Sequence, residues 1–296
     1  MLMGRNMATK GRIWEVNERG FLISDAKLEH IQPPFKAVVD DVVEAYLKHI
    51  KQDLHSIYIT GSVARGLAVE GQSDLDAIAV LEYYTDPELV MQDWVTRTEA
   101  EILAKHDCVS DVQMDIYPHG WLLHDESEFS ISAFILKTHA VCVWGIDMSP
   151  DLTTYKFSDK ETRIAIANDD IIQLEPDIDE AIEAIEANNS PDNVRYWCKR
   201  ICKNIIHSAF GLVMVAEAVH TRDIDISVSY FLKGYPDQER GISQAVDFVL
   251  SPTESASEIL DYLDTFGAWL IAECNRWLDE HNPECDIEYQ FERDDE

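Results

Sequence analysis

The sequence predicts an α+β protein, in which a small mixed β-sheet domain over residues 1–150 is followed by an α-helical bundle domain over residues 151–296. In the first half, short runs of β-branched and aromatic residues alternate with amphipathic runs, which is typical of a mixed sheet with helices. A stretch at 149–154 that contains Ser, Pro and Thr then marks a linker, after which apolar residues recur at helical spacing. With 296 residues, of which 46% are hydrophobic, the chain is long enough for two domains with their own cores.

The elements of the first half follow from apolar spacing and from the residues at their ends. Apolar side chains recur at helical spacing over residues 35–50, whereas the run at 56–60 is rich in β-formers and ends at Gly61. Asp86 as N-cap with Pro87 behind it is typical of a helix start, and Pro118 ends a strand. The predicted order is a short strand or hairpin within 12–31, a helix at 35–50, strands at 56–60 and 75–81, a helix at 86–105, a strand at 112–117, a helix or strand at 129–136 and a closing strand at 140–144.

The second half is predicted to be helical throughout. Ser190, Pro191 and Asp192 are typical of the start of a long helix, and a similar Ser-Pro pattern precedes a further apolar stripe. The predicted helices are 178–187, 190–219 and one that starts at 251–254 and runs to 280, before an acidic tail at 286–296 that we expect to fray.

The charge of the chain limits its partners. It has 24 Lys and Arg against 56 Asp and Glu, and the formal net charge is therefore −32. Duplex nucleic acid and anionic membranes both need clustered positive charge, so neither is expected as a partner. Two interpretations of the acidity stay open: solubility in a salty cytoplasm, and attraction of a cationic substrate.

The sequence indicates a cytoplasmic protein. Its first residues contain no apolar export signal, and the longest apolar run, at 209–216, is too short to span a bilayer. The six cysteines are therefore expected to be reduced. Cys198 and Cys202 lie four residues apart among isoleucines, which favours a buried helix face over a metal site.

A glycine turn after the strand at 56–60 has the composition of an anion-binding loop. Gly61 allows the backbone to approach a ligand closely, and the amides that follow it can point at anionic oxygens. Ser62 adds a hydroxyl donor, and Arg65 adds a guanidinium that can bind a phosphate through two hydrogen bonds.

Two acidic residues begin the strand at 75–81. Asp74 and Asp76 are separated by one residue, so they project from the same face of a strand. Two neighbouring carboxylates among apolar residues repel each other unless a cation lies between them. Mg²⁺, bound together with the phosphates of a substrate, fits two oxygen ligands of this kind best.

A third acid lies inside the strand at 112–117. Aspartate is disfavoured in strand interiors, so Asp115 is a candidate to complete the metal site from a neighbouring strand. Asp111 has the same parity, and we prefer Asp115 because its flanking residues are more apolar. An exposed acid on an edge strand is the alternative for Asp115.

These residues resemble the DNA polymerase beta-like nucleotidyltransferase superfamily. The pattern Gly-Ser-x-Ala-Arg-Gly, followed by Ser-Asp-x-Asp and a later strand Asp, is similar to the bacterial branch that holds the aminoglycoside adenylyltransferases and the minimal nucleotidyltransferases. The resemblance covers about residues 55–117, and the helical domain behind it is also like the aminoglycoside enzymes. It implies that Asp74 and Asp76 bind Mg²⁺ and that Asp115 is a further metal ligand or the general base. It also implies a nucleotide site made of Gly61, Ser62, Arg65 and Ser73.

Basic residues gather on one face of the long helix at 190–219. Arg195, Lys199 and Lys203 follow one another at intervals of four residues, which is unusual in so acidic a chain. We expect Lys199 and Lys203 to bind the triphosphate, with Arg222 as a further phosphate contact. A solvated face paired with acids is the alternative.

Together these features predict a Mg²⁺-dependent enzyme that transfers AMP from ATP to an acceptor hydroxyl and releases pyrophosphate. A cationic small molecule is the favoured acceptor, and a protein hydroxyl, as in an AMPylating regulator, is the runner-up. A catalytically silent nucleotide-binding module is an alternative from another class. An RNA-acting helical domain is a weaker one, based on the spacing of Arg200 and His207. The sequence leaves the oligomeric state open.

Overall fold

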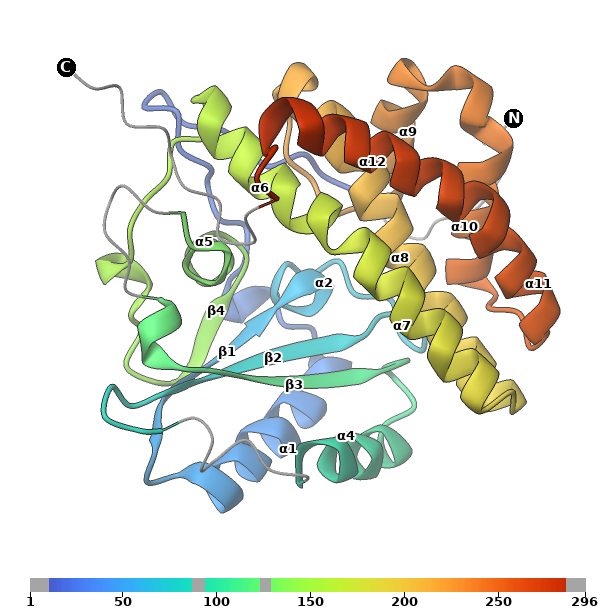
Figure 1. Ribbon diagram of the computed structural model, residues 1–296. Helices are drawn as coiled ribbons and strands as arrows, with labels where there is room; N and C mark the ends of the chain where they lie inside the picture. The colour runs from blue at the N-terminus through green and yellow to red at the C-terminus, as the bar shows by residue number, and fades with distance from the viewer. Residues whose placement is uncertain (1–10, 87–93, 123–128, 286–296) are drawn as a thin grey trace. The chain divides into compact units, whose positions relative to one another are not determined.

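The computed structural model describes residues 11–86, 94–122 and 129–285, which form two units (Figure 1). One unit comprises residues 16–155 and contains the sheet. The other comprises residues 11–15 together with the chain from 156 onward, and it is helical. A mixed sheet followed in sequence by a helical region is the fold class that the sequence predicts, and the structure confirms it.

The sheet has four strands in the order β3-β2-β1-β4. The central pair β1–β2 and the pair β1–β4 are antiparallel, whereas β3 runs parallel to β2 and forms an edge. All four predicted strands are present, with bounds that shift by at most two residues. They are β1 (Leu54–Thr60), β2 (Leu75–Leu81), β3 (Val112–Tyr117) and β4 (Val141–Gly145).

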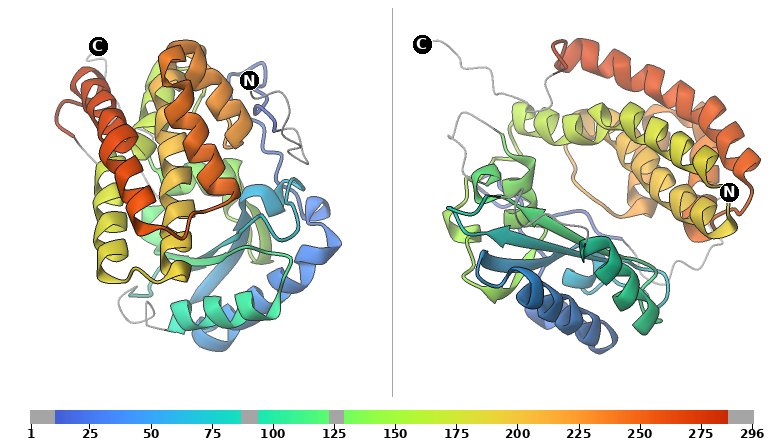
Figure 2. Two further views of the ribbon diagram at one scale, coloured as in Figure 1. Left: turned by 90° about the vertical axis from the view of Figure 1, so that its right-hand side faces the viewer. Right: turned by 60° about the horizontal axis from the view of Figure 1, so that its bottom comes forward.

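Helices cover both faces of this sheet. Helices α1 (Pro33–Ile50) and α4 (Trp94–Lys105) pack on one face, as both views of the sheet show (Figures 1 and 2). Helix α5 (Ile131–Thr138) packs on the other face, which settles the open choice between helix and strand at 129–136. The apolar residues of each strand alternate between these two cores, as a side-chain period of two requires.

Two predictions for the sheet unit need adjustment, and a third concerns residues outside the described ones. The hairpin expected within 12–31 is a single bridge between Val16 and Leu22. Pro33 and Pro34 are the first residues of α1, because proline at the start of a helix lacks only an N–H that has no partner within the helix. The start predicted for the helix at 86–105 falls on residues 87–93, which lie outside the described residues.

The helical unit is built around α8 (Pro191–Glu217), whose apolar residues are buried along its length. Five other helices pack against α8, because its apolar residues spread around much of its circumference. The remaining helices are α6 (Lys160–Ile172), α7 (Leu174–Ala187), α9 (Ile224–Gly234), α10 (Glu239–Leu250), α11 (Ala256–Tyr262) and α12 (Ala268–His281). Five short helical segments complete the description: the α2 turn (Gly61–Ala64) and the 3₁₀ turns Leu28–His30, His119–Trp121, Ser149–Asp151 and Pro236–Gln238.

The prediction of one helix from 251–254 to 280 is wrong at its start. The helix begins at Ala256, because the Ser255 hydroxyl accepts the backbone N–H of Glu258 and caps it. It then continues to His281, and a π-helical turn, Leu263–Gly267, joins α11 to α12 without a break in the helical backbone. The Thr265 hydroxyl lies within hydrogen-bond distance of two carbonyls in the preceding turn, and such side-chain bonds compete with the regular backbone pattern. The acidic tail at 286–296 lies outside the described residues.

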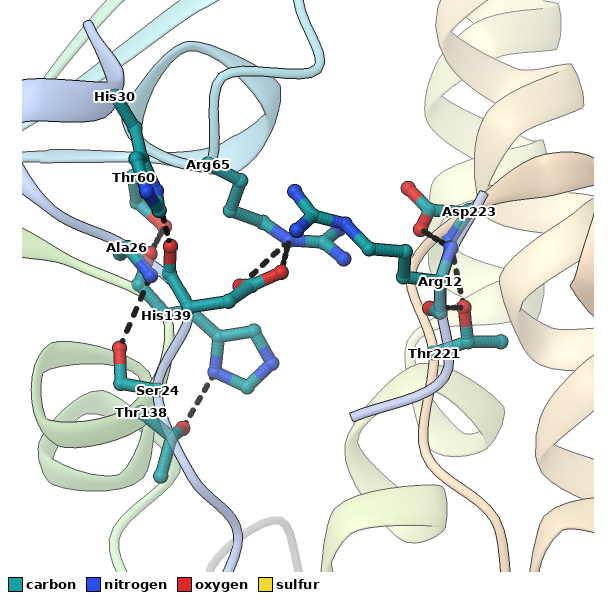
Figure 3. Close-up of polar contacts among 11 residues, drawn as sticks. Arg12, Ser24, Ala26, His30, Thr60, Arg65, Thr138, His139, Thr221 and Asp223 are labelled. Atoms are coloured by element: carbon teal, nitrogen blue, oxygen red, sulfur yellow. Dashed lines mark hydrogen bonds and ion pairs between the residues drawn. The ribbon is translucent and has the colours of Figure 1, made fainter. Parts of the chain in front are cut away.

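The segment 11–15 packs within the helical unit, although it precedes the sheet unit in sequence. The backbone N–H of Trp14 donates to the carbonyl of His220 at 3.0 Å, and the two rings are in contact. The N–H of Arg12 donates to the carboxylate of Asp223 at 2.7 Å (Figure 3). None of the helices within the described ranges is long and apolar enough to cross a membrane.

Candidate active site

The glycine turn and one of the predicted metal ligands lie against each other. Strand β1 ends at Thr60, which pairs with Asp76 of β2. The next residue, Gly61, has φ +69°, and a Cβ atom added to it would lie 2.7 Å from Oδ2 of Asp76. Glycine accepts this backbone conformation without steric cost and leaves room for this oxygen, so the turn and the carboxylate lie together.

Side chains alternate along β2 between the two faces of the sheet. Leu75 and Ala77 point toward α1 and α4, whereas Ile78 and Val80 belong to the core beneath α5. Asp76 shares the face of Ile78, and its side chain is partly exposed. Asp74 precedes the strand and is also partly exposed. Two carboxylates therefore lie at the start of β2, and that of Asp76 lies against Gly61.

Asp115 lies on the same face of the neighbouring edge strand. It pairs in register with Ile78, while Gln113 pairs with Asp76. Asp115 is two residues further along β3 than Gln113, the partner of Asp76. This offset puts the Cα atoms of Asp76 and Asp115 roughly 8 Å apart. Asp115 is exposed, although its neighbours Met114 and Ile116 are buried. The glutamine beside Asp76 gave no signal in the sequence.

Among the residues that the structure describes, no group of three or more His, Cys, Asp or Glu side chains is gathered closely enough to hold a metal ion. Asp76 and Asp115 share a sheet face, Asp74 lies just before β2, and the three do not form a closed cluster. The competing Asp111 accepts the backbone N–H of Val112 at 2.9 Å, so its carboxylate is directed toward the start of its own strand.

Arg65 and Ser73 of the predicted nucleotide loop have structural partners. Arg65 is 3% exposed, and its Nε donates to both carboxylate oxygens of Asp25, at 2.8 and 3.1 Å (Figure 3). A buried guanidinium requires such a partner, which the sequence did not indicate. Ser73 accepts the backbone N–H of Val69 at 2.9 Å, and this bond shapes the loop between Gly61 and β2.

A buried tyrosine of α1 holds the backbone beneath the site. Tyr46 of α1 is fully buried, and its hydroxyl lies 2.9 Å from the carbonyl of Asp115 and 3.2 Å from the carbonyl of Ala77. Burial, with a smaller effect of the Asp115 charge, raises the pKa of Tyr46 well above its usual value. The phenol therefore stays protonated and can donate to these carbonyls.

The basic residues predicted to bind phosphate belong to the helical unit. Lys199 and Lys203 are partly exposed on α8. Arg222 donates from one nitrogen to both oxygens of Asp170, at 2.7 and 2.9 Å. Arg195 forms ion pairs with Asp192 and Glu254, so this part of the face has acidic partners of its own.

Two titratable groups close to Arg222 are only partly exposed. Burial, together with the charge of Asp170, raises the pKa of Asp169 to about 7. Burial lowers the pKa of His207 well below its usual value, and the positive charges of Arg222 and Lys203 add to this effect. His207 is therefore neutral at physiological pH. Elsewhere on α8, Arg200 packs over the Trp197 ring at 5.5 Å. Cys198 and Cys202 are both buried on α8.

The comparisons with known proteins find similarity among solved structures. No protein-family model matches the chain, and no curated protein matches it. Among solved structures, the chain is similar to spectinomycin adenyltransferase AAD(9) from Enterococcus faecialis, solved with ATP and spectinomycin. The TM-score is 0.47 and the sequence identity is 18%, over 78% of this chain and 98% of that chain. A likeness at this level assigns no residue of the site.

Proposed function

We propose that the protein is a Mg²⁺-dependent nucleotidyltransferase that transfers AMP from ATP to an acceptor hydroxyl and releases pyrophosphate. One observation carries the proposal: an oxygen of Asp76 lies against the backbone of the Gly61 turn. Two further carboxylates accompany this contact, Asp74 at the start of β2 and Asp115 on the same face of β3. Phosphate binding, metal binding and proton acceptance are the three tasks that such a transfer requires.

The Gly61 turn is proposed to bind the terminal phosphates. Gly61 has no side chain, so a phosphate can approach its backbone closely. Ser62 follows directly and is partly exposed, so its hydroxyl can donate to a phosphate oxygen. Arg65 contributes indirectly here, because its ion pair with Asp25 ties the loop to the preceding segment.

Asp74 and Asp76 are proposed to hold Mg²⁺. Their oxygens are hard ligands, and Mg²⁺ is commonly bound by one or two carboxylates together with substrate phosphates and water. When bound, the ion supplies positive charge that neutralises the triphosphate and the leaving pyrophosphate.

Asp115 is assigned to the proton-accepting role. It is exposed, and it lies on the adjacent strand two residues beyond the partner of Asp76. It can therefore reach an incoming hydroxyl without being a ligand of the same ion. The acceptor oxygen forms a bond to the α-phosphorus, and the bond from that phosphorus to the bridging oxygen breaks. The hydroxyl proton passes to Asp115, and pyrophosphate leaves with the bond electrons.

The acceptor is proposed to be a cationic small molecule that carries hydroxyl groups. The net charge of −32 attracts such a molecule, and the attraction weakens as salt screens it. The same net charge repels ATP, which is an anion. Lys199 and Lys203 are therefore proposed as its basic contacts. A protein hydroxyl remains the second candidate acceptor.

The test uses the full chain with ATP labelled at the α-phosphate, Mg²⁺ and a panel of amino-sugar polyols and neutral polyols. We expect pyrophosphate release and transfer of label to a cationic member of the panel, with a rate that falls as salt is raised. Transfer to a neutral polyol at an equal rate would contradict the acceptor class. Absence of both label transfer and Mg²⁺-dependent ATP binding, measured by calorimetry, would overturn the function itself.

A further inference from the structure

Tyr46 lies under the seam between the two strands that carry the candidate carboxylates. Its ring belongs to the core between the sheet and α1, on the face opposite Asp76 and Asp115. Its hydroxyl reaches the carbonyl of Ala77, the residue after Asp76, and the carbonyl of Asp115 itself. One hydroxyl thus contacts the backbone of both strands at the positions next to the site.

A second side chain holds the same stretch of β3. The carboxylate of Glu99, on α4, accepts the backbone N–H of Met114 at 2.7 Å. Strand β3 is an edge, so this N–H has no further strand to donate to. The Trp94 ring of α4 meets the Tyr46 ring edge-on at 6.1 Å. Helices α1 and α4 are therefore in contact with each other, and a side chain from each holds the backbone of β3.

We propose that Tyr46 is a positioning residue, which fixes the carboxylates of Asp76 and Asp115 relative to each other by holding the backbone of β2 and β3 from behind. The inference rests on the proposed function, because it is the transfer reaction that requires this placement. A phenylalanine would fill the same apolar space without a polar atom to satisfy, so the hydroxyl has to be explained by what it bonds. Misplacement of a reacting group by about 1 Å can cost roughly 10²-fold in rate.

The test compares Tyr46→Phe with a matched variant, Tyr262→Phe. Tyr262 is also buried, and its hydroxyl also donates to one backbone carbonyl, that of Gly241 at 3.2 Å, but within the helical unit. Both variants lose one buried hydroxyl, so both should lower the melting temperature by a similar small amount. Only Tyr46→Phe should lower kcat, by about 10-fold, with the KM for ATP changed less than about 3-fold.

Hydrogen–deuterium exchange gives a readout that does not depend on activity. In Tyr46→Phe the amides of 76–79 and 113–117 should exchange about 10-fold faster, because the seam loses a contact, while those of the β1–β4 pair stay unchanged. Tyr262→Phe should leave all of these amides unchanged.

The outcomes separate this inference from the proposed function. If the wild-type chain transfers AMP and Tyr46→Phe keeps its kcat within about 2-fold, the positioning role is wrong and the function stands. If Tyr262→Phe loses kcat equally, the effect is general destabilisation and the positioning role is again wrong. If the wild-type chain shows no transfer, the proposed function fails, and unchanged exchange at 76–79 and 113–117 would then refute the seam contact as well.

Discussion

The sheet unit and the helical unit position their candidate residues in different ways. In the sheet unit, hydrogen-bonded register brings residues from separate strands together. Asp76 of β2 pairs with Thr60 of β1 on one side and with Gln113 of β3 on the other. In the helical unit, charged residues are presented along helix faces, and several have acidic partners close by, as Arg222 has in Asp170. Register is specified by backbone geometry, whereas a helix face only offers side chains to whatever lies beside it. Register therefore places the carboxylate candidates on adjacent strands, whereas the partners of the basic residues depend on what packs beside α8.

The strongest test of this comparison removes a carboxylate from the site. Asp74→Asn and Asp76→Asn should each lower AMP transfer by about 10²- to 10³-fold, because the metal loses a ligand whose charge the reaction needs. Thermal unfolding should be unchanged or slightly delayed, since two like charges no longer repel each other. The matched control is Asp40→Asn, an exposed acid on α1, which should keep wild-type turnover. Near wild-type transfer by either site variant at saturating Mg²⁺ would make the metal assignment untenable.

The second test addresses the helical unit. If Lys199 and Lys203 bind the triphosphate, replacing both with Ala should weaken ATP binding by about 10²-fold, at roughly 1.5–3 kcal/mol for each desolvated contact. Calorimetric titration at fixed salt and Mg²⁺ measures the dissociation constant. Lys156→Ala with Lys160→Ala removes the same two charges from exposed positions of the same unit, and should have little effect. An equal dissociation constant in the two double variants would restrict phosphate recognition to the sheet unit.

A third test concerns the contact that joins the turn to the carboxylate. Gly61→Ala places a methyl group against Oδ2 of Asp76 and requires a left-handed backbone that alanine adopts at a cost of about 1–2 kcal/mol. We expect about 10-fold slower transfer together with a lower melting temperature. Gly120→Ala is the control, because nothing lies within 4 Å of the added atom and the residue has no positive φ. Full activity of Gly61→Ala would separate the turn from the site.

The smallest expected effect is a pH-dependent change of stability in the helical unit. Burial raises the pKa of Asp169 to about 7, well above its ordinary value of 3.8, so the folded state binds more protons between about pH 4 and 7. Stability therefore falls as pH rises through this window, and the loss is complete above pH 7. Asp169→Asn cannot ionise, so its melting temperature should exceed that of the wild type by a few degrees at pH 8 and by less at pH 5. Asp179→Asn, at an exposed position on α7, should show no such difference between the two pH values, and a flat profile for Asp169→Asn would contradict the buried acid.

Local patterns predicted much of the sheet unit. Runs of β-formers that end at glycine or proline located the strands, because strand propensity and strand ends are encoded within a few residues. The one-residue separation of Asp74 and Asp76 predicted a shared face, because side chains alternate along a strand wherever that strand lies. Helix ends were predicted less well: the start was expected at 251–254, and the observed bond between the Ser255 hydroxyl and Glu258 places it at Ala256.

The sequence by itself determined the strands, the helical second half and the pattern of Gly61, Ser62, Asp74 and Asp76, because each depends on spacing within a short stretch. Only the tertiary structure decided which distant partners these residues have. The Arg65 guanidinium pairs with Asp25, forty residues earlier, and the Tyr46 hydroxyl reaches the Asp115 carbonyl from the opposite face of the sheet. Such contacts depend on how elements pack, and packing is a property of the whole chain that no local period records.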